Sequence, residues 1–417
     1  MIRNNPLCGL FLLLIAGHWM AAVGKAGSVL DFTAAPHNYW KRQPQDVCTA
    51  LAAKIASGEV TLDTTDEKAF AKSVLDALQV PVSSQLLVYS ATSLQSERCN
   101  PRNPRALYFN EHAYVAVILG GRLEMMGIDS EMGCTFYAFS KAQPGVKPVV
   151  ERSTQCFNCH AGNGTQRVPG LLATSVAPIL SGASYETYRH DEQGHQIPLS
   201  VRFGGWYVTS ARPFGETKAN ILAINKGKGI EIVRVNPGEM WDTTRHLLPT
   251  GDILPQLVHE HQIGFDNRVI QAVYLLREVE AKGSPPPPED QAKLDAKARE
   301  LVRYILFADE AKLPAGGIAG DPQFVRDFQL YKKAAAGGAS LKDFDLRSRM
   351  FKHRCSYMLY TPQWQQLPAA IKTRVYSGLK SALTGDDRKF AYLGDDERKA
   401  ILAILCATLP DLPADWR

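Results

Sequence analysis

The chain has 417 residues, of which 45% are hydrophobic and 21% charged, and this ordinary composition excludes a disordered, fibrous or coiled-coil protein. Its length is enough for about two or three domains with cores of their own. The formal net charge of +5 is small and evenly spread, so it indicates neither a nucleic-acid groove nor a polybasic membrane patch.

The amino terminus has the pattern of a secretory signal peptide. Arg3 precedes a short apolar run over residues 7–17, and small residues gather at 21–27, where a signal peptidase could cleave. The run is too short to be a stable membrane anchor, and no later apolar stretch reaches the length of a membrane-spanning helix. We therefore expect residues 1–26 to be a signal peptide and the mature chain to be periplasmic or otherwise exported, with no membrane span. A buried N-terminal helix is the alternative.

Apolar periodicity divides the mature chain into three segments. Residues 27–150 predict two helices and then an antiparallel β block, with helices over 45–57 and 66–78 and strands over 86–90, 106–109, 113–119, 123–128 and 134–139. Residues 151–225 are irregular, with one strand-like piece over 201–210. Residues 226–417 predict a mainly helical region with a Pro-rich loop at 283–290 and helices over 252–280, 291–307, 322–333, 368–383 and 396–408. The predicted fold class is α+β, with a small β-rich N-terminal block and a mainly α-helical C-terminal region.

The irregular segment contains one motif that carries chemistry. Cys156-Phe157-Asn158-Cys159-His160 is the pattern C-x-x-C-H, the attachment motif of c-type haem. Two thiols at this spacing can bond to the two vinyl groups of one macrocycle, and the adjacent imidazole can bind the iron as its proximal ligand. A thioredoxin-like redox pair or a zinc site is the alternative, but glycines and a proline follow the motif, and no second Cys/His pair stands at zinc-ligand spacing. We expect one covalently attached haem c within residues 151–225.

Two further features of this segment could serve the haem. Val168-Pro169-Gly170-Leu171 resembles the loop of class I cytochromes c, in which a proline carbonyl accepts a hydrogen bond from the proximal imidazole. A plain turn is the alternative. Arg202, followed by aromatic residues, is a candidate to bind a haem propionate, because a guanidinium offers a carboxylate two parallel hydrogen bonds. A surface arginine on a strand is the alternative.

The group across the iron from His160 decides between an electron carrier and a catalyst. Residues 252–280 predict an amphipathic helix, capped by Asp252, with His261 on its apolar face and His259 off that face in solvent. His261 is therefore a candidate distal ligand, although a lone histidine on an apolar face can also be an ordinary core residue. Met240 follows a Pro-Gly turn and is the first of the methionine candidates; the others are Met125, Met126, Met350 and Met358. An open sixth position and Lys218 also remain.

Five cysteines besides the haem pair remain in the predicted mature chain, so at least one of them stays unpaired within the molecule. Cys99 and Cys134 stand at the borders of the β block. They are the pair that we expect to bond.

Several stretches resemble a family of secreted bacterial proteins that have one c-type haem motif and no assigned biochemical role. The matching pieces cover nearly the whole mature chain and include the haem motif, residues 168–170, 203–209 and 260–262, and the region around Cys355. The resemblance implies a cytochrome c-like haem segment. Family members continue after Gly-Gly-Trp-Tyr-Val-Thr with a histidine-rich loop ending His-Met-Gly-Asn, whereas this chain continues Ser210-Ala211-Arg212-Pro213. This departure favours Lys218, His261 or an open site over a methionine ligand.

These features predict an exported mono-haem c-type cytochrome that transfers electrons to or from a redox protein or a small-molecule donor or acceptor. A haem-dependent oxidoreductase, peroxidase-like or oxidase-like, is the alternative, because the chain is far longer than a minimal electron carrier needs. A haem-based gas sensor is the third possibility.

Overall fold

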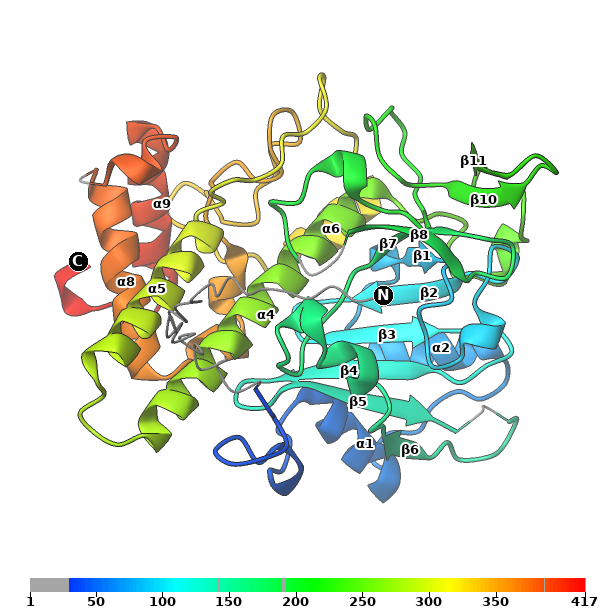
Figure 1. Cartoon of the computed structure of the whole chain (residues 1–417), viewed down its shortest axis with the longest axis horizontal. Coiled ribbons are helices and arrows are strands. Elements are labelled where there is room, and N and C mark those ends of the chain that lie inside the picture. Colours follow the sequence, from blue (N-terminus) through cyan, green and yellow to red (C-terminus); the bar gives the residue numbers. More distant parts are fainter. Residues whose placement is uncertain (1–29, 141–142, 190–192, 386, 417) are drawn as a thin grey trace, which may run out of the picture. The chain divides into compact units, whose positions relative to one another are not determined.

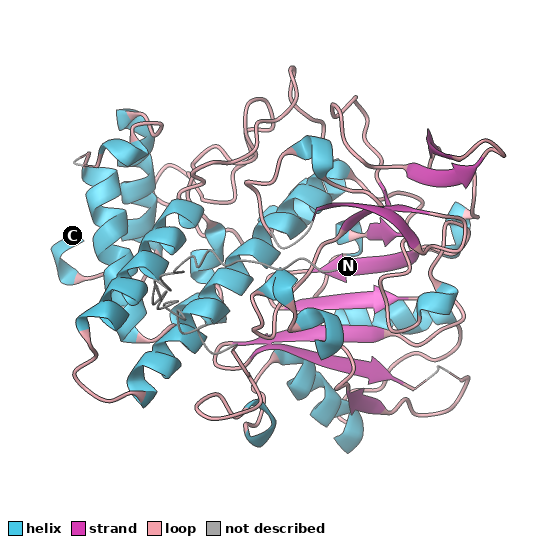
Figure 2. Ribbon diagram, in the orientation of Figure 1, coloured by secondary structure: helices cyan, strands magenta, loops and turns pink. Residues whose placement is uncertain are grey.

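The computed structural model describes residues 30–140, 143–189, 193–385 and 387–416, so the predicted signal peptide lies outside the described residues. Residues Asp31–Arg417 form one compact unit. This unit combines an antiparallel sheet from the N-terminal half with helices that dominate the C-terminal half, which confirms the α+β class (Figures 1 and 2).

The described residues contain a seven-stranded antiparallel sheet with the order β6-β5-β4-β3-β2-β1-β9. Its strands are β1 (Leu86–Val88), β2 (Arg105–Phe109), β3 (Ala113–Val117), β4 (Glu124–Asp129), β5 (Gly133–Phe139), β6 (Val150–Arg152) and β9 (Trp206–Tyr207). The five strands predicted between residues 86 and 139 are β1 to β5, with ends that differ by at most two residues. Two hairpins lie outside this sheet and were not predicted: β7 (Ser175–Pro178) with β8 (Ser184–Arg189), and β10 (Ile221–Asn225) with β11 (Ile230–Arg234).

The helices are α1 (Val47–Ser57), α2 (Glu67–Ala77), α3 (Phe157–His160), α4 (Ile253–Ala281), α5 (Pro288–Ile305), α6 (Pro322–Gln329), α7 (Pro362–Gln365), α8 (Ala369–Thr384) and α9 (Asp395–Thr408). All of the predicted helices are present, whereas the short α3 and α7 were not predicted. Helix α5 begins inside the predicted Pro-rich loop, because Pro288 has no N–H to satisfy and so suits a first turn. Helix α6 stops four residues earlier than predicted, and the next residues, Leu330 and Tyr331, are exposed and have no core to pack against. None of the described helices is long and apolar enough to cross a membrane.

The strand predicted over residues 201–210 is mostly wrong, since only the two residues of β9 pair with the sheet. Phe203 and Gly205 have positive φ angles of 69° and 83°, which break an extended conformation. Gly204 lies so close to the preceding hairpin that a Cβ there would come within 2.5 Å of the Val176 carbonyl oxygen. Tight packing of the backbone, rather than side-chain alternation, therefore determines this segment.

The sheet has helices on both faces. Residues of α1 and α2, such as Leu51 and Phe70, pack with one set of alternating strand residues, which includes Tyr108 and Met125. Helix α4 packs on the other face, as Figure 1 shows, and its buried residues lie on every side of the helix. Asp252 caps the first turn of α4 by accepting a hydrogen bond from the Leu254 N–H at 3.0 Å, as predicted.

Candidate functional site

A cavity of about 650 Å³ lies against the α4 face of the sheet. Cys156, Cys159 and His160 all line it, together with apolar side chains of β2 to β5 and residues of α4. The volume falls within the range of small-molecule and cofactor sites in proteins. The structure therefore brings the three residues of the predicted haem motif to one cavity; we call it the motif cavity.

The motif forms a single helical turn, α3. The N–H groups of Cys159 and His160 donate to the Cys156 carbonyl at 3.2 and 3.0 Å, and this turn places residues three and four apart on one side. Phe157 takes the opposite side and is buried among aromatic rings, with Tyr39 and Phe136 centred 5.0 and 5.1 Å away. The buried phenylalanine thus anchors a turn whose sulfur atoms and imidazole line the cavity.

His160 is held in one tautomer. Its Nδ1 lies 2.9 Å from the Gly170 carbonyl oxygen, which can only accept, so Nδ1 carries the proton and Nε2 keeps its lone pair. Burial lowers the pKa of His160 to about 4, so the imidazole is neutral at pH 7. A neutral imidazole with a free Nε2 is the form that binds iron.

Hydrogen bonds hold the loop after the motif at three successive residues. The acceptor of the predicted hydrogen bond from His160 is one residue later than predicted. The carbonyl that accepts from His160 belongs to Gly170, whereas the Pro169 carbonyl accepts from the Cys134 N–H at 3.0 Å. Leu171 exchanges two hydrogen bonds with the Asn267 side chain on α4, at 2.8 and 2.9 Å. A glycine is needed at 170 because a Cβ would come within 2.6 Å of Asn267 Oδ1.

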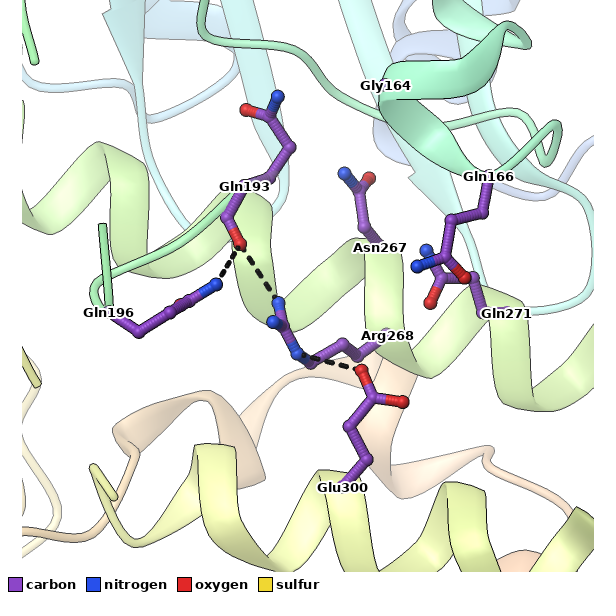
Figure 3. Close-up of a pocket in the computed structure, with 8 residues that line it drawn as sticks. All are labelled: Gly164, Gln166, Gln193, Gln196, Asn267, Arg268, Gln271 and Glu300. Atoms are coloured by element: carbon purple, nitrogen blue, oxygen red, sulfur yellow. Dashed lines mark hydrogen bonds and ion pairs between the residues drawn. The ribbon is translucent and has the colours of Figure 1, made fainter. Parts of the chain in front are cut away.

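A smaller polar cavity of about 220 Å³ borders the same loop, as Figure 3 shows. Arg268 of α4 spans it: Nη1 donates to the Gln193 carbonyl at 3.0 Å and Nε lies 3.2 Å from Glu300 Oε1. Helix α4 therefore fixes both the loop that orients His160 and the chain near Gln193.

The lining of the motif cavity also includes residues whose role or position the sequence did not predict. Arg105 lines it, and its buried Nε has no hydrogen-bond partner among the described residues. Met125 and Met126 of β4 both line the cavity, but Met126 packs against the core on the α4 face of the sheet, whereas Met125 belongs to the core on the other face. His259 of α4 also lines the cavity and is only 3% exposed, so the prediction that it is solvated is wrong.

Arg202 does not reach this cavity. It is 2% exposed and lies 3.0 Å from Glu260 Oε2 through Nη1, while its Nε donates to the Ile197 carbonyl at 2.7 Å. Arg189 makes the second ion pair to Glu260, at 2.7 Å. The structure does not support Arg202 as the propionate-binding residue, because its guanidinium is already used inside the core.

His261 is not at the cavity either. Two residues along α4 from His259, it projects to the other side of the helix, where Nδ1 lies 2.8 Å from His195 Nδ1 and Nε2 lies 2.8 Å from Ser356 Oγ. The ring is fully buried. With both nitrogens hydrogen-bonded, His261 is a core histidine, and the structure does not support it as the distal ligand.

The buried, neutral His261 predicts a pH effect on stability. Burial lowers its pKa to about 3, against about 6.5 in an unfolded chain, so on acidification below pH 6.5 only the unfolded state binds a proton here. Through this residue, the free energy of unfolding of the wild type should fall by up to about 1.4 kcal/mol for each pH unit below 6.5. His261→Gln has no imidazole at this position and so lacks this pH dependence. In urea unfolding, the variant should have a lower free energy of unfolding than the wild type at pH 7, and the difference between the two should be smaller at pH 5. An equal fall in the free energy of unfolding of both chains between pH 7 and pH 5 would contradict the prediction.

The remaining predicted candidates lie elsewhere. Met240 packs at the edge of the core beneath α1 and α2, and Lys218 Nζ lies 4.3 Å above the Tyr188 ring. Neither residue lines the motif cavity. The described cysteines are all free, so the expected bond between Cys99 and Cys134 is not formed; both are buried.

Among the residues that the structure describes, no three His, Cys, Asp or Glu side chains are grouped to hold a metal ion. A haem iron needs only axial ligands from the protein, so the motif cavity does not require such a group. No protein-family model, curated protein or solved structure matches this chain.

Proposed function

We propose that this chain is an exported mono-haem c-type cytochrome that exchanges electrons with a redox protein or with a small-molecule donor or acceptor. The observation that carries the proposal is that Cys156, Cys159 and His160 line one cavity of about 650 Å³, with His160 already in the tautomer that can bind iron. The pattern of residues 1–26 and the resemblance to secreted mono-haem proteins support the exported location.

The cavity suits a covalently attached macrocycle. Each cysteine would add its S–H across one vinyl group, so that sulfur bonds to one carbon and the proton goes to the other. This addition of a thiol to a vinyl group needs no oxidant or reductant. Burial raises the pKa of the Cys156 thiol, whose Sγ donates to Ser153 Oγ at 3.2 Å, so this sulfur is a protonated thiol near pH 7.

Haem c, when bound, supplies the one-electron chemistry of its iron. His160 would offer Nε2 to the iron, and the Gly170 carbonyl keeps the ring in place and makes it a stronger donor. Apolar side chains such as Leu107 and Phe136 exclude water from the site, which tunes the reduction potential. Arg105 lines the cavity, and its buried Nε has no hydrogen-bond partner in the part of the chain that the structure describes, so Arg105 replaces Arg202 as the residue that would bind a propionate.

The test is to express the full chain in a bacterium with a cytochrome c assembly system. We expect haem that stays on the polypeptide in a denaturing gel, one iron per chain, and reversible reduction and oxidation by small mediators. A chain that folds without covalent haem, or whose haem cannot be cycled reversibly, would refute the proposal.

A haem enzyme is the second candidate, and one observation favours it. Arg105 and His259 both line the cavity, each has a buried nitrogen atom without a hydrogen-bond partner among the described residues, and such side chains could act on a substrate bound at an open iron site. High-spin ferric iron and turnover with peroxide would distinguish this enzyme from an electron carrier.

A further inference from the structure

Four side chains form one row across the sheet at the motif cavity. Phe109 pairs with Tyr114, Tyr114 with Met126, and Met126 with Phe136, in the registers of β2 to β5. Phe109, Tyr114 and Phe136 belong to the core on the α4 side of the sheet, and the partly buried Met126 packs against that core. Because neighbouring strands are about 4.8 Å apart, Tyr114 and Phe136 stand about 10 Å from each other along this row.

The two imidazoles of the cavity stand over opposite ends of the row. The His160 ring is centred 4.8 Å from the Phe136 ring. The His259 ring is centred 5.4 Å from Phe109 and 5.7 Å from Tyr114. Met126 lies between the two ends, so it borders the space between the imidazoles from the sheet side.

His259 has the burial and the unmet bonding capacity of a ligand. It is 3% exposed, and its buried Nδ1 has no hydrogen-bond partner among the described residues. A buried polar group without a partner costs about 1–3 kcal/mol, so its retention needs a reason. His261, two residues away, has both ring nitrogens satisfied by His195 and Ser356 and needs no further partner.

The geometry points to His259 as the distal iron ligand: we propose that the haem is held between His160 and His259, with Met126 beside its edge. This inference rests on the proposed function, because it requires a haem bound at His160. It assigns the protein a six-coordinate iron with two imidazole ligands. Such an iron has no open position for a substrate, which favours electron transfer over catalysis.

The experiment compares the spectra of wild type, His259→Ala and His261→Ala, each matured with haem in the full chain. Wild type should be low-spin in both oxidation states, with the near-infrared charge-transfer band of two imidazole ligands. His259→Ala should keep its covalent haem but become high-spin, and added imidazole should restore the low-spin spectrum. His261→Ala should stay low-spin, because that ring faces the other side of α4.

Two spectra of the wild type overturn this inference. A methionine–iron band, which Met126→Leu would then abolish, leaves the proposed electron transfer intact, whereas a high-spin spectrum would also favour the haem enzyme over the electron carrier. A low-spin His259→Ala variant with intact haem overturns it as well. Should His259→Ala fail to fold, His259→Met replaces it, and we expect a methionine–iron band and a higher reduction potential. If no chain carries covalent haem, the proposed function itself fails.

Discussion

A chain with both Cys156→Ser and Cys159→Ser is expected to carry no covalently attached haem. Serine has no thiol to add to a vinyl group, and both cysteines line the motif cavity. Either single variant should retain haem through one thioether, in reduced yield. The measurement is haem staining after denaturing electrophoresis, with the stain normalised to the amount of polypeptide.

Cys406→Ser is the matched control. This thiol is partly buried at the other end of the chain, where Sγ lies 3.3 Å from the Trp416 carbonyl oxygen, and it does not line the motif cavity. Its haem stain should equal that of wild type. Haem that survives denaturation in the double variant would show that the motif does not attach it.

The second large effect is expected at Glu260, the shared partner of two buried arginines. Arg189 and Arg202 contact its two oxygens at 2.7 and 3.0 Å, and all three side chains are at most 4% exposed. Glu260→Gln keeps the shape of the side chain but removes the carboxylate that the two buried guanidinium groups share as their ion-pair partner. We expect a loss of about 3–5 kcal/mol in the free energy of unfolding.

Urea unfolding of the holoprotein measures this loss, with Glu131→Gln as the control. Glu131 pairs with Arg42 at the same 2.7 Å, but its side chain is 66% exposed, so this ion pair should contribute less than about 1 kcal/mol. If both substitutions lowered the free energy of unfolding equally, the buried ion pairs would contribute no more to stability than the exposed one. The wild-type slope against urea should be kept, since a change in slope would indicate a different unfolded state.

Local patterns in the sequence were sufficient for most of the secondary structure. Alternation of side chains in β1 to β5 and apolar periodicity in α1, α2 and α4 are properties of single segments, and each was predicted within two residues. Segments shaped by backbone packing were not predicted. The two hairpins β7–β8 and β10–β11 have no strong alternation, and the turn around Gly204 depends on contact with Val176.

The sequence by itself also determined which residues carry the proposed chemistry at the motif, because C-x-x-C-H needs only one helical turn to bring its members together. Which other residues line the motif cavity depends on the tertiary structure alone. A helix buried on every side has no single apolar face, so periodicity placed His259 in solvent and made His261 the candidate ligand, whereas packing buries both rings and brings only His259 to the motif cavity. In the same way, charge and aromatic neighbours favoured Arg202, but Glu260 holds it in the core and Arg105 reaches the cavity. These assignments depend on which residues distant in the chain meet in space, and no local pattern contains that information.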